Sequence, residues 1–257
     1  MRQGGREWKT EGEVQNGEQS RGKSRELMVE RMPNRLDTGI RAMSDVKRKL
    51  ASLLKIILGR VFAYEDMIVL ETSSQHSPKP LPLSAWPSSR RNAEIKVRLA
   101  AKDDVPKFDR FEKITAAKAR ERFEAGHFCF IAEENGRIVN YTWVCFYEAY
   151  IDELELRIRI DRDSAYRYDG YTDPEYRGMG ILPKVLMSSS DYLFRNGIKT
   201  IYDLVGANNF PSIRSHQKIG SRKMGQVTLL RLFKSKRYRC EGETPEDFHK
   251  LKQMFSI

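Results

Sequence analysis

The stretch Tyr171-Thr-Asp-Pro-Glu-Tyr-Arg-Gly-Met-Gly-Ile-Leu182 joins a run typical of a strand to a run typical of a helix. We expect the strand over residues 165–171 and the helix from Ile181. Gly178 and Gly180 place backbone without side chains at the turn, beside N–H groups that have no partner within the helix. Those groups and the positive end of the helix dipole favour an anion, so the stretch predicts a phosphate or pyrophosphate site.

Two common phosphate-binding loops are excluded by the residues present. No G-x-x-x-x-G-K-[ST] pattern occurs, and Pro183 stands where a third glycine would complete G-x-G-x-x-G. A proline there suits the first turn of a helix, where its missing N–H would have no partner anyway. Two glycines alone also fit an ordinary turn between a strand and a helix, so the surrounding residues decide the interpretation.

Two segments together resemble the GNAT superfamily of N-acetyltransferases. Arg177-Gly-Met-Gly180 resembles the acyl-CoA pyrophosphate loop of that family, R/Q-x-x-G-x-G/A. Arg177 and Gly180 match the pattern, whereas Leu182 stands where the family has Gly or Ala. The resemblance covers roughly residues 94–233.

The second segment, Asn209-Phe-Pro-Ser-Ile-Arg-Ser-His-Gln-Lys-Ile-Gly-Ser221, resembles the family motif N-x-x-A-x-x-x-Y-x-K-x-G-F. The matching positions are Asn209, Lys218 and Gly220. The departures are Ser212, His216 and Ser221, which replace Ala, Tyr and Phe. The order and distance of the two segments agree with the family.

The resemblance implies an α+β fold, with a mixed, mostly antiparallel sheet flanked by helices in α/β/α layers. The chain's own pattern agrees: a strand, helices, several antiparallel strands, a helix, a strand, a helix and a strand follow one another. In the family, the fourth and fifth strands splay apart and the acyl thioester lies between them.

The resemblance also implies acetyl-CoA as co-substrate and direct attack by an amine in a ternary complex. The residues expected at the cofactor are Tyr171, Thr172, Arg177, Gly178, Met179, Gly180, Ile181, Leu182, Asn209 and Ser212. No Ser/His/Asp or Cys/His arrangement requires a covalent intermediate. The acceptor is left open among small amines, amino sugars, peptide N-termini and lysines.

Acyl transfer to an amine needs a proton acceptor for the amine and a proton donor for the leaving thiolate. Leu204 stands where some relatives carry a glutamate base, and the neighbouring Asp203 should face the other side of its strand. Asp169 is the preferred base because it lies in the cofactor-facing strand. His216, at the place of the motif tyrosine, is the candidate acid. A structural carboxylate and a surface histidine are the alternative interpretations.

The net charge of +11 and the sequence pI near 9.5 fit a solvated basic surface and an anionic partner, either CoA or nucleic acid, equally well. One alternative function is a nucleic-acid-binding module built on residues 231–239, which are basic with aromatic residues between them. It leaves the glycine turn unexplained, so CoA is preferred. Another is a CoA-binding sensor without catalysis, which the missing tyrosine and glutamate permit.

The three cysteines are Cys129, Cys145 and Cys240, and no C-x-x-C pattern occurs, which favours a reducing cytoplasm. The four histidines show no metal-ligand spacing, so no metal is predicted. The apolar segment 50–64 is too short and too charged to span a bilayer. No signal peptide is expected in residues 1–42. A homodimer is left open.

The chain divides into a disordered basic tract (1–42), a helix, short strand and Pro/Ser-rich linker (43–93), a GNAT-like domain (94–233) and a basic segment with a C-terminal helix (234–257). Strands are expected at 67–70, 95–99, 128–132, 138–146, 154–160, 165–171, 200–205 and 227–233. Helices are expected at 46–61, from 103 or 104 to 125, at 181–196, at 211–218 and from Thr244.

Overall fold

The structure of the protein, a computed structural model, describes residues 62–75 and 95–257. The tract 1–42, the helix predicted at 46–61 and most of the linker predicted at 72–92 lie outside the described residues. Within the described part, no helix is both long enough and apolar enough to cross a membrane.

The elements follow one another from an N-terminal strand to a C-terminal helix. The strands are β1 (Phe62–Ser73), β2 (Lys96–Leu99), β3 (Phe128–Glu134), β4 (Arg137–Cys145), β5 (Glu148–Ile151), β6 (Leu156–Arg159), β7 (Ser164–Thr172), β8 (Thr200–Gly206), β9 (Arg222–Leu232) and β10 (Ser235–Gly242). The α-helices are α2 (Ala116–Glu124), α3 (Ile181–Arg195), α4 (Phe210–Lys218) and α5 (Pro245–Phe255), with 3₁₀-helices η2 (Lys102–Arg110) and η3 (Pro174–Tyr176).

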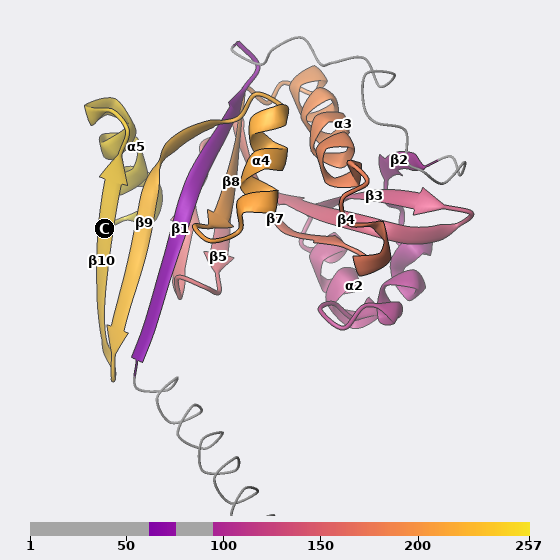
Figure 1. Ribbon diagram of the computed structural model, residues 1–257, viewed down its shortest axis with the longest axis horizontal. Coiled ribbons are helices and arrows are strands. Elements are labelled where there is room, and N and C mark those ends of the chain that lie inside the picture. The colour runs from indigo at the N-terminus through magenta and orange to yellow at the C-terminus, as the bar shows by residue number, and fades with distance from the viewer. Residues whose placement is uncertain (1–61, 76–94) are drawn as a thin grey trace, which may run out of the picture. The chain divides into compact units, whose positions relative to one another are not determined.

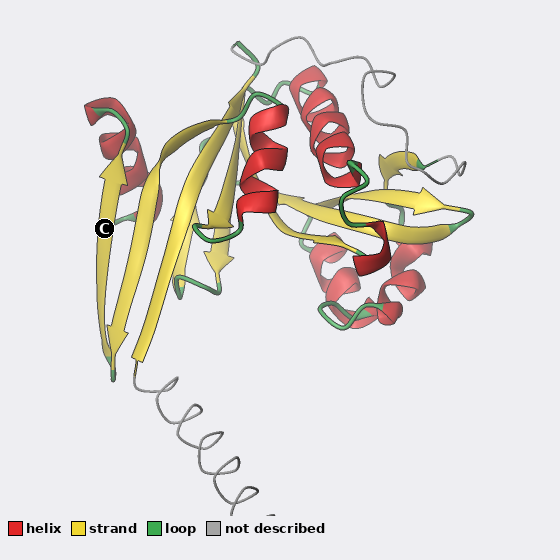
Figure 2. Cartoon of the chain, viewed as in Figure 1, coloured by secondary structure: helices red, strands yellow, loops and turns green. Residues whose placement is uncertain are grey.

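Eight strands form one sheet in the order β10-β9-β1-β8-β7-β4-β3-β2, and β5 and β6 form a separate ribbon (Figure 1). All neighbours in the large sheet run antiparallel except β7 and β8, which are parallel. Helices lie against both faces of the sheet (Figure 2). This arrangement confirms the predicted α+β class with a mixed, mostly antiparallel sheet.

Alternating side chains of β3 build two separate layers of core. Cys129 and Ile131 pack with η2 and α2, whereas Phe130 and Ala132 pack with α3 on the opposite face. The period of two follows from the pleat of a strand. Because both faces are covered, the strand reads as a continuous apolar run rather than as an alternation.

The other half of the sheet carries its core on the α2 side. Side chains of β1, β8 and β9 pack there with the β5–β6 ribbon and with α5, which contributes Leu251 and Phe255. Tyr168 of β7 touches both this cluster and the one under α2, so the two clusters share a face. The layers leave a space between α2 and the ribbon, and the candidate site lies there.

Strand β1 is longer and more central than the sequence predicts. The prediction covers residues 67–70, but the strand has 12 residues and pairs with β8 and β9 on its two sides. Charged residues such as Glu65 and Asp66 interrupt the apolar pattern in the first half of the strand, so the sequence does not predict that half. Gln226 and Thr228 of β9 hydrogen-bond to Asp66, which compensates for the partly buried charge.

Strand β10 is absent from the prediction, which gives residues 234–257 only a basic segment and a helix. Its side chains are mostly exposed and charged, so no strong apolar alternation marks it. Charged residues on an edge strand discourage pairing with other chains. The following helix α5 is confirmed, with Thr244 as its cap: the Asp247 N–H donates to Thr244 Oγ1 at 3.1 Å.

The helical region predicted from 103 or 104 to 125 forms two separate helices. The first is η2, which contains Pro106, and the second is α2, whose cap is Thr115. A proline inside a helix removes one hydrogen bond and crowds the preceding turn, so Pro106 disfavours a regular α-helix in the first segment. The strand predicted at 154–160 also shortens to β6 and pairs with β5 rather than with the large sheet.

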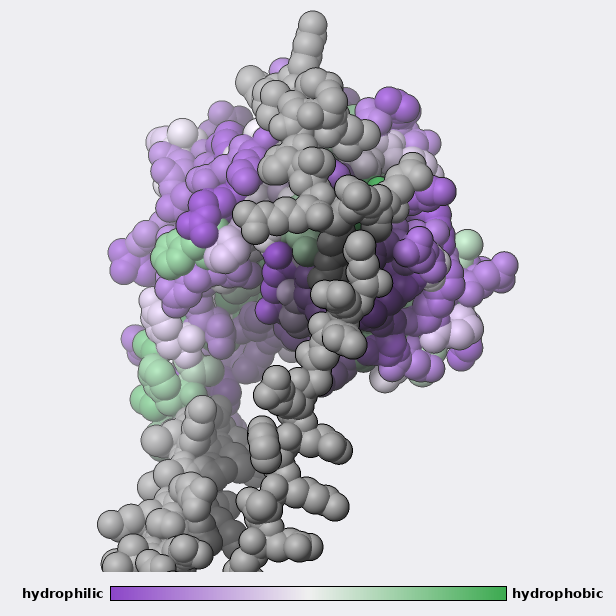
Figure 3. Space-filling view, turned by 45° about the vertical axis from the view of Figure 1, so that its right-hand side comes forward, coloured by the Kyte–Doolittle hydropathy of each residue, from purple (hydrophilic) through white to green (hydrophobic). Residues whose placement is uncertain are grey.

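Four of the large apolar side chains that stay exposed lie in two pairs at one end of β1 and β9. Phe62 faces Leu232 and Tyr64 faces Leu230 across the two strands. Elsewhere the surface seen in Figure 3 is mainly hydrophilic (purple), with small hydrophobic patches (green). Most of the large apolar side chains of the described part are buried in the core.

A buried ion pair stands at the last parallel contact of β7 and β8. Arg167 of β7 and Asp203 of β8 are 2% and 3% exposed, and the guanidinium contacts both carboxylate oxygens, at 2.9 and 2.7 Å. Arg167 also donates to the Leu186 carbonyl and to two serine hydroxyls of α3. Burial opposes ionisation of Asp203, but Arg167 and the contact with His216 outweigh it and hold the pKa of the carboxyl well below its usual range.

Replacing Asp203 by Asn should destabilise the protein strongly, because it leaves the buried Arg167 charge without a counter-charge. We expect a loss of about 3–5 kcal/mol in the free energy of unfolding, measured in urea. Asp163→Asn is the control, since its pair with Lys199 is exposed and should matter far less. Equal effects of the two substitutions would contradict the role given to the buried pair.

Candidate functional site

The sheet forks directly after the Arg167–Asp203 pair. Parallel pairing of β7 and β8 runs from Ser164 and Thr200 to Arg167 and Asp203 and then stops. β7 continues along β4 as far as Thr172, while β8 continues along β1. Figure 1 shows β1 and β8 running at a steep angle to β3 and β4. Each arm therefore presents a strand edge that faces the gap and not another strand.

A β-bulge in β7 lies at the mouth of the fork. The register of β4 and β7 shifts between the pairs Tyr141–Tyr171 and Trp143–Tyr168, and Asp169 has a positive φ of 47°. A bulge places two residues opposite one and redirects their side chains. As a result, the consecutive residues Tyr168 and Asp169 both line the same cavity.

The glycine turn lies at the far end of β7. Gly178 and Gly180 have φ values of 77° and 71°, a region that residues with a Cβ rarely occupy. No atom lies within 4 Å of a Cβ built at either position, so the space above the turn is open. Helix α3 begins at Ile181 with no side chain capping it and no acidic residue in its first turn. Its N-terminal N–H groups are therefore available to an anion.

The predicted cofactor residues near this turn come together. Arg177 donates from Nε to the Thr172 carbonyl at 3.2 Å, and its guanidinium lies 5.9 Å from the centre of the Tyr171 ring. Leu182, which departs from the family pattern, packs with Leu186 and Ile219 between α3 and α4. The bulky side chain thus has a place in the core between two helices.

The predicted residues on α4 have structural partners of their own. Asn209 caps the helix, with Oδ1 accepting the Ser212 N–H at 3.3 Å. His216 is buried: its Nδ1 donates to the Ser212 carbonyl and its Nε2 lies 3.2 Å from Asp203. His216 therefore joins the network of Arg167 and is not among the residues that line the cavity. Its proposed role as a proton donor stays a prediction.

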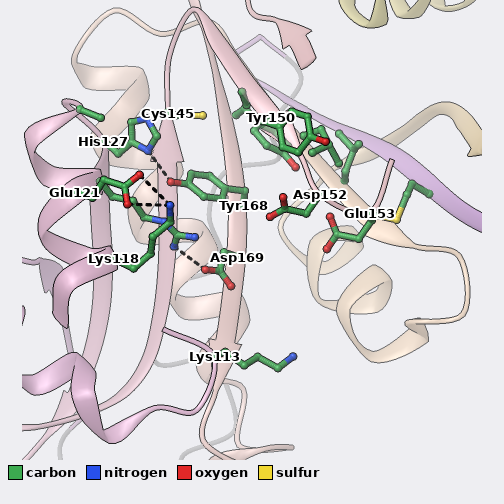
Figure 4. A pocket seen from close by; sticks show the side chains of 17 residues that line it. Lys113, Lys118, Glu121, His127, Cys145, Tyr150, Asp152, Glu153, Tyr168 and Asp169 are labelled. Atoms are coloured by element: carbon green, nitrogen blue, oxygen red, sulfur yellow. Dashed lines mark hydrogen bonds and ion pairs between the residues drawn. The ribbon is translucent and has the colours of Figure 1, made fainter. Parts of the chain in front are cut away.

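A cavity of about 580 Å³ opens where the fork, α2 and the β5–β6 ribbon meet (Figure 4). Both arms of the fork contribute to its wall, β7 through Tyr168 and β8 through Leu204. Asp169, the predicted base, also lines it. The buried Cys145 thiol lies at its wall, and burial raises the pKa of that thiol to about 12. No thiolate is therefore expected from Cys145 at neutral pH.

The charged groups of the cavity divide into paired and unpaired ones. Arg122 pairs with Asp169 at 2.6 Å, and Lys118 pairs with Glu121 at 2.9 Å. Asp152 and Glu153, on the turn of the ribbon, form no ion pair with any described residue. Figure 4 shows both carboxylates across from His127, Glu121 and Lys118, with Tyr168 and Asp169 between the two groups.

Among the residues of this cavity that sequence reasoning missed are Arg122, His127 and Tyr168. Arg122 lies over the rings of Trp143 and Tyr168, with its guanidinium carbon 5.1 and 4.9 Å from their centres. A 2.6 Å hydrogen bond joins His127 Nδ1 and Tyr168 Oη. Only their positions in the sequence could have pointed to these residues. His127 follows Gly126 at the end of a helix, and Tyr168 precedes the predicted base.

Burial sets the protonation of the His127–Tyr168 pair. It raises the pKa of the Tyr168 phenol well above its usual value, so the phenol stays protonated at neutral pH. Burial and the charge of Arg122 lower the pKa of His127, so the imidazole is neutral there. Among the described residues, no group of three or more His, Cys, Asp or Glu side chains is placed to hold a metal ion.

A sequence model of a known family matches the middle of the chain. Residues 96–220 match the sequence model of the acetyltransferase (GNAT) family. The central strand β1 precedes this range, and the whole of β9 follows it. No curated protein matches the chain.

The solved structures that match this chain share little sequence with it. A Drosophila protein is 12% identical, with a TM-score of 0.46; the match covers 73% of this chain and 59% of that protein. A putative acetyltransferase from Salmonella typhimurium, solved with its cofactor acetyl-CoA, is 20% identical, with a TM-score of 0.38 and coverage of 52% and 80%. The ribosomal-protein-S18-alanine N-acetyltransferase of Escherichia coli is 16% identical, with a TM-score of 0.40 and coverage of 49% and 77%.

Gly180→Ala should destabilise the protein although the added methyl group meets nothing. Its positive φ should cost an alanine about 1–2 kcal/mol in the free energy of unfolding. Gly206→Ala is the matched control, because its surroundings are equally open and its φ is ordinary. That change should be neutral or slightly stabilising. Equal stability of the two variants in urea would show that the turn does not depend on the left-handed conformation.

Proposed function

We propose that residues 96–220, which match the acetyltransferase (GNAT) family, form a domain that transfers an acyl group from acyl-CoA, in particular acetyl-CoA, to an amine. The observation that carries the proposal is the position of the fork, which opens between the glycine turn and the cavity. The pyrophosphate of CoA binds the turn, the thioester enters the fork, and the acceptor occupies the cavity.

In this proposal, the pyrophosphate of the cofactor binds the free N–H groups at the start of α3. Gly178, Met179 and Gly180 bring the backbone to the pyrophosphate, and Ile181 and Leu182 follow in the first turn. Arg177 adds a positive charge beside them and is exposed. Tyr171 and Thr172 belong to the β7 arm along which the pantetheine chain runs. Asn209 and Ser212, at the start of α4, complete the proposed cofactor contacts.

The acceptor side is suited to a group that carries positive charge. Asp152 and Glu153 attract an ammonium group, and they have no cationic partner among the described residues. Asp169 stays a proposed contributor, with its carboxylate held by Arg122. Direct attack by the amine on the thioester fits the cavity, because burial keeps Cys145 in the thiol form.

The basic edge of the molecule gives less support to a nucleic-acid-binding module. Arg231 and Lys236, both in the basic stretch, lie at 3.0 and 2.8 Å from the Glu155 carboxylate. Part of the positive charge is therefore neutralised by the protein itself. A sensor that binds CoA without turnover would share the glycine turn, so turnover separates it from the enzyme.

Gly180→Glu should weaken acetyl-CoA binding, because it puts a side chain and a negative charge where the pyrophosphate lies. We expect a loss of about tenfold or more in affinity, equal to about 1.4 kcal/mol, by calorimetry. Gly136→Glu is the matched control: it has a positive φ of 80°, open space and the same added charge, in the β3–β4 turn. Absence of heat with wild-type protein at millimolar acetyl-CoA would reject both the transferase and the sensor.

Turnover is measured as CoA release from acetyl-CoA with a panel of amines. Asp152→Asn combined with Glu153→Gln should raise KM for a cationic amine by about three- to tenfold with little change in kcat, as expected for exposed charges that only bind substrate. Glu148→Gln is the control, because this residue of the same ribbon pairs with exposed Arg157 outside the cavity. An unchanged KM in the double variant would remove these carboxylates from the acceptor site.

A further inference from the structure

We propose that His127 is the general base of the cavity and takes the proton that the acceptor's ammonium group loses before attack. The inference rests on the acyl transfer proposed above and adds the residue that moves the proton. Neither the family match nor the sequence motifs point to this position.

The backbone fixes His127 at the wall of the cavity. Helix α2 ends just before it, and Gly126 turns the chain with a φ of 80°. The His127 N–H donates to the Arg122 carbonyl at 2.9 Å, which closes the helix end. The next residue begins β3. A half-buried imidazole is thus held between a helix and a sheet, where its position is well defined.

Tyr168 orients the imidazole ring. The 2.6 Å bond joins Nδ1 to Oη, and the two rings meet edge to face, with an angle of 88° between their planes. In the tautomer that carries its hydrogen on Nδ1, His127 donates to Tyr168 and the lone pair of Nε2 is free. No described residue hydrogen-bonds to Nε2. Tyr168 is therefore a positioning residue, and Nε2 is the atom offered to the acceptor.

The charged surroundings keep His127 in its neutral form. The titratable groups that face the cavity around it are Lys118, Glu121 and Arg122 of α2, Cys145 of β4, Tyr150, Asp152 and Glu153 of the ribbon, Tyr166, Tyr168 and Asp169 of β7, and Lys113. Burial lowers the pKa of His127, and so do Arg122 and Lys118, whereas Glu121 acts in the opposite direction. The imidazole is consequently ready to accept a proton near neutral pH.

The nearby carboxylates are less suited to the task. Asp169 is bound to Arg122, and Glu121 is bound to Lys118 through both oxygens, at 2.9 and 3.0 Å. Taking a proton would weaken each of these ion pairs. Asp152 and Glu153 are exposed to water, and no ion pair with a described residue holds either carboxylate in place. His127 is the cavity group whose ordinary pKa lies nearest to neutrality.

The proton balance closes with the groups named. One proton of the ammonium passes to Nε2 of His127, and the free amine then attacks the thioester carbon. A C–N bond forms and the C–S bond breaks. The second amine proton ends on the sulphur as CoA leaves as a thiol, and His127 returns its proton to solvent. The products are the amide, the CoA thiol and one proton.

The test compares His127→Gln with the wild type, using the best amine of the panel. We expect kcat to fall about 10²- to 10⁴-fold, as for loss of a general base. Acetyl-CoA affinity by calorimetry should stay within about twofold, because the base acts only on the acceptor. In the wild type, kcat/KM should rise with pH through the pKa of His127, below about 6.5, and the variant should lose this limb. His249→Gln, at an exposed position of α5, is the control.

Tyr168→Phe provides a second variant if His127→Gln lowers the thermal stability. It removes the acceptor of the Nδ1–H, which stabilises the imidazolium, so the acidic limb should move to lower pH. The assignment of His127 is overturned if the wild-type protein turns over an amine and both variants keep the wild-type rate and pH profile. If the wild-type protein binds acetyl-CoA but releases no CoA with any amine, the transfer reaction fails, and the assignment fails with it.

Discussion

The buried Arg167–Asp203 pair is the interaction on which the rest of the architecture depends. A charge removed from water needs a partner and further hydrogen bonds, and Arg167 finds them on β8 and α3. His216 brings α4 into the same network through Asp203. Four elements are therefore fixed to one another at the point where the parallel strands separate. The fork has a rigid apex, and its two arms are free to hold a ligand.

Strand β7 connects the apex to every part of the proposed site. Along its length it presents Arg167 at the apex, Tyr168 and Asp169 at the cavity, and Tyr171 and Thr172 beside the glycine turn. The bulge at Asp169 makes this possible, because it brings two neighbouring side chains to one face. A regular strand would send one of them to the opposite face, toward α3.

Local signals account for what the sequence predicts correctly. Asn135-Gly136 marks the β3–β4 hairpin, and both residues have the positive φ that a tight turn requires. Gly197 ends α3 in the same way. Strand β10 and the first half of β1 were not predicted because pairing within the sheet, and not apolar alternation, holds them in place.

Within the candidate site, the glycine turn can be predicted from the sequence. The contact of His127 with Tyr168 depends on a bulge and on a helix end far apart in the chain, and no local pattern encodes it.

The central claim is that acyl-CoA occupies the fork and the glycine turn together. Hydrogen exchange of backbone amides with and without acetyl-CoA tests it directly, because both regions present N–H groups that the ligand would cover. The account predicts slower exchange in residues 168–172 and 177–182, and no change in β10. Unchanged exchange in both regions at saturating acetyl-CoA, or protection confined to another part of the chain, would contradict it.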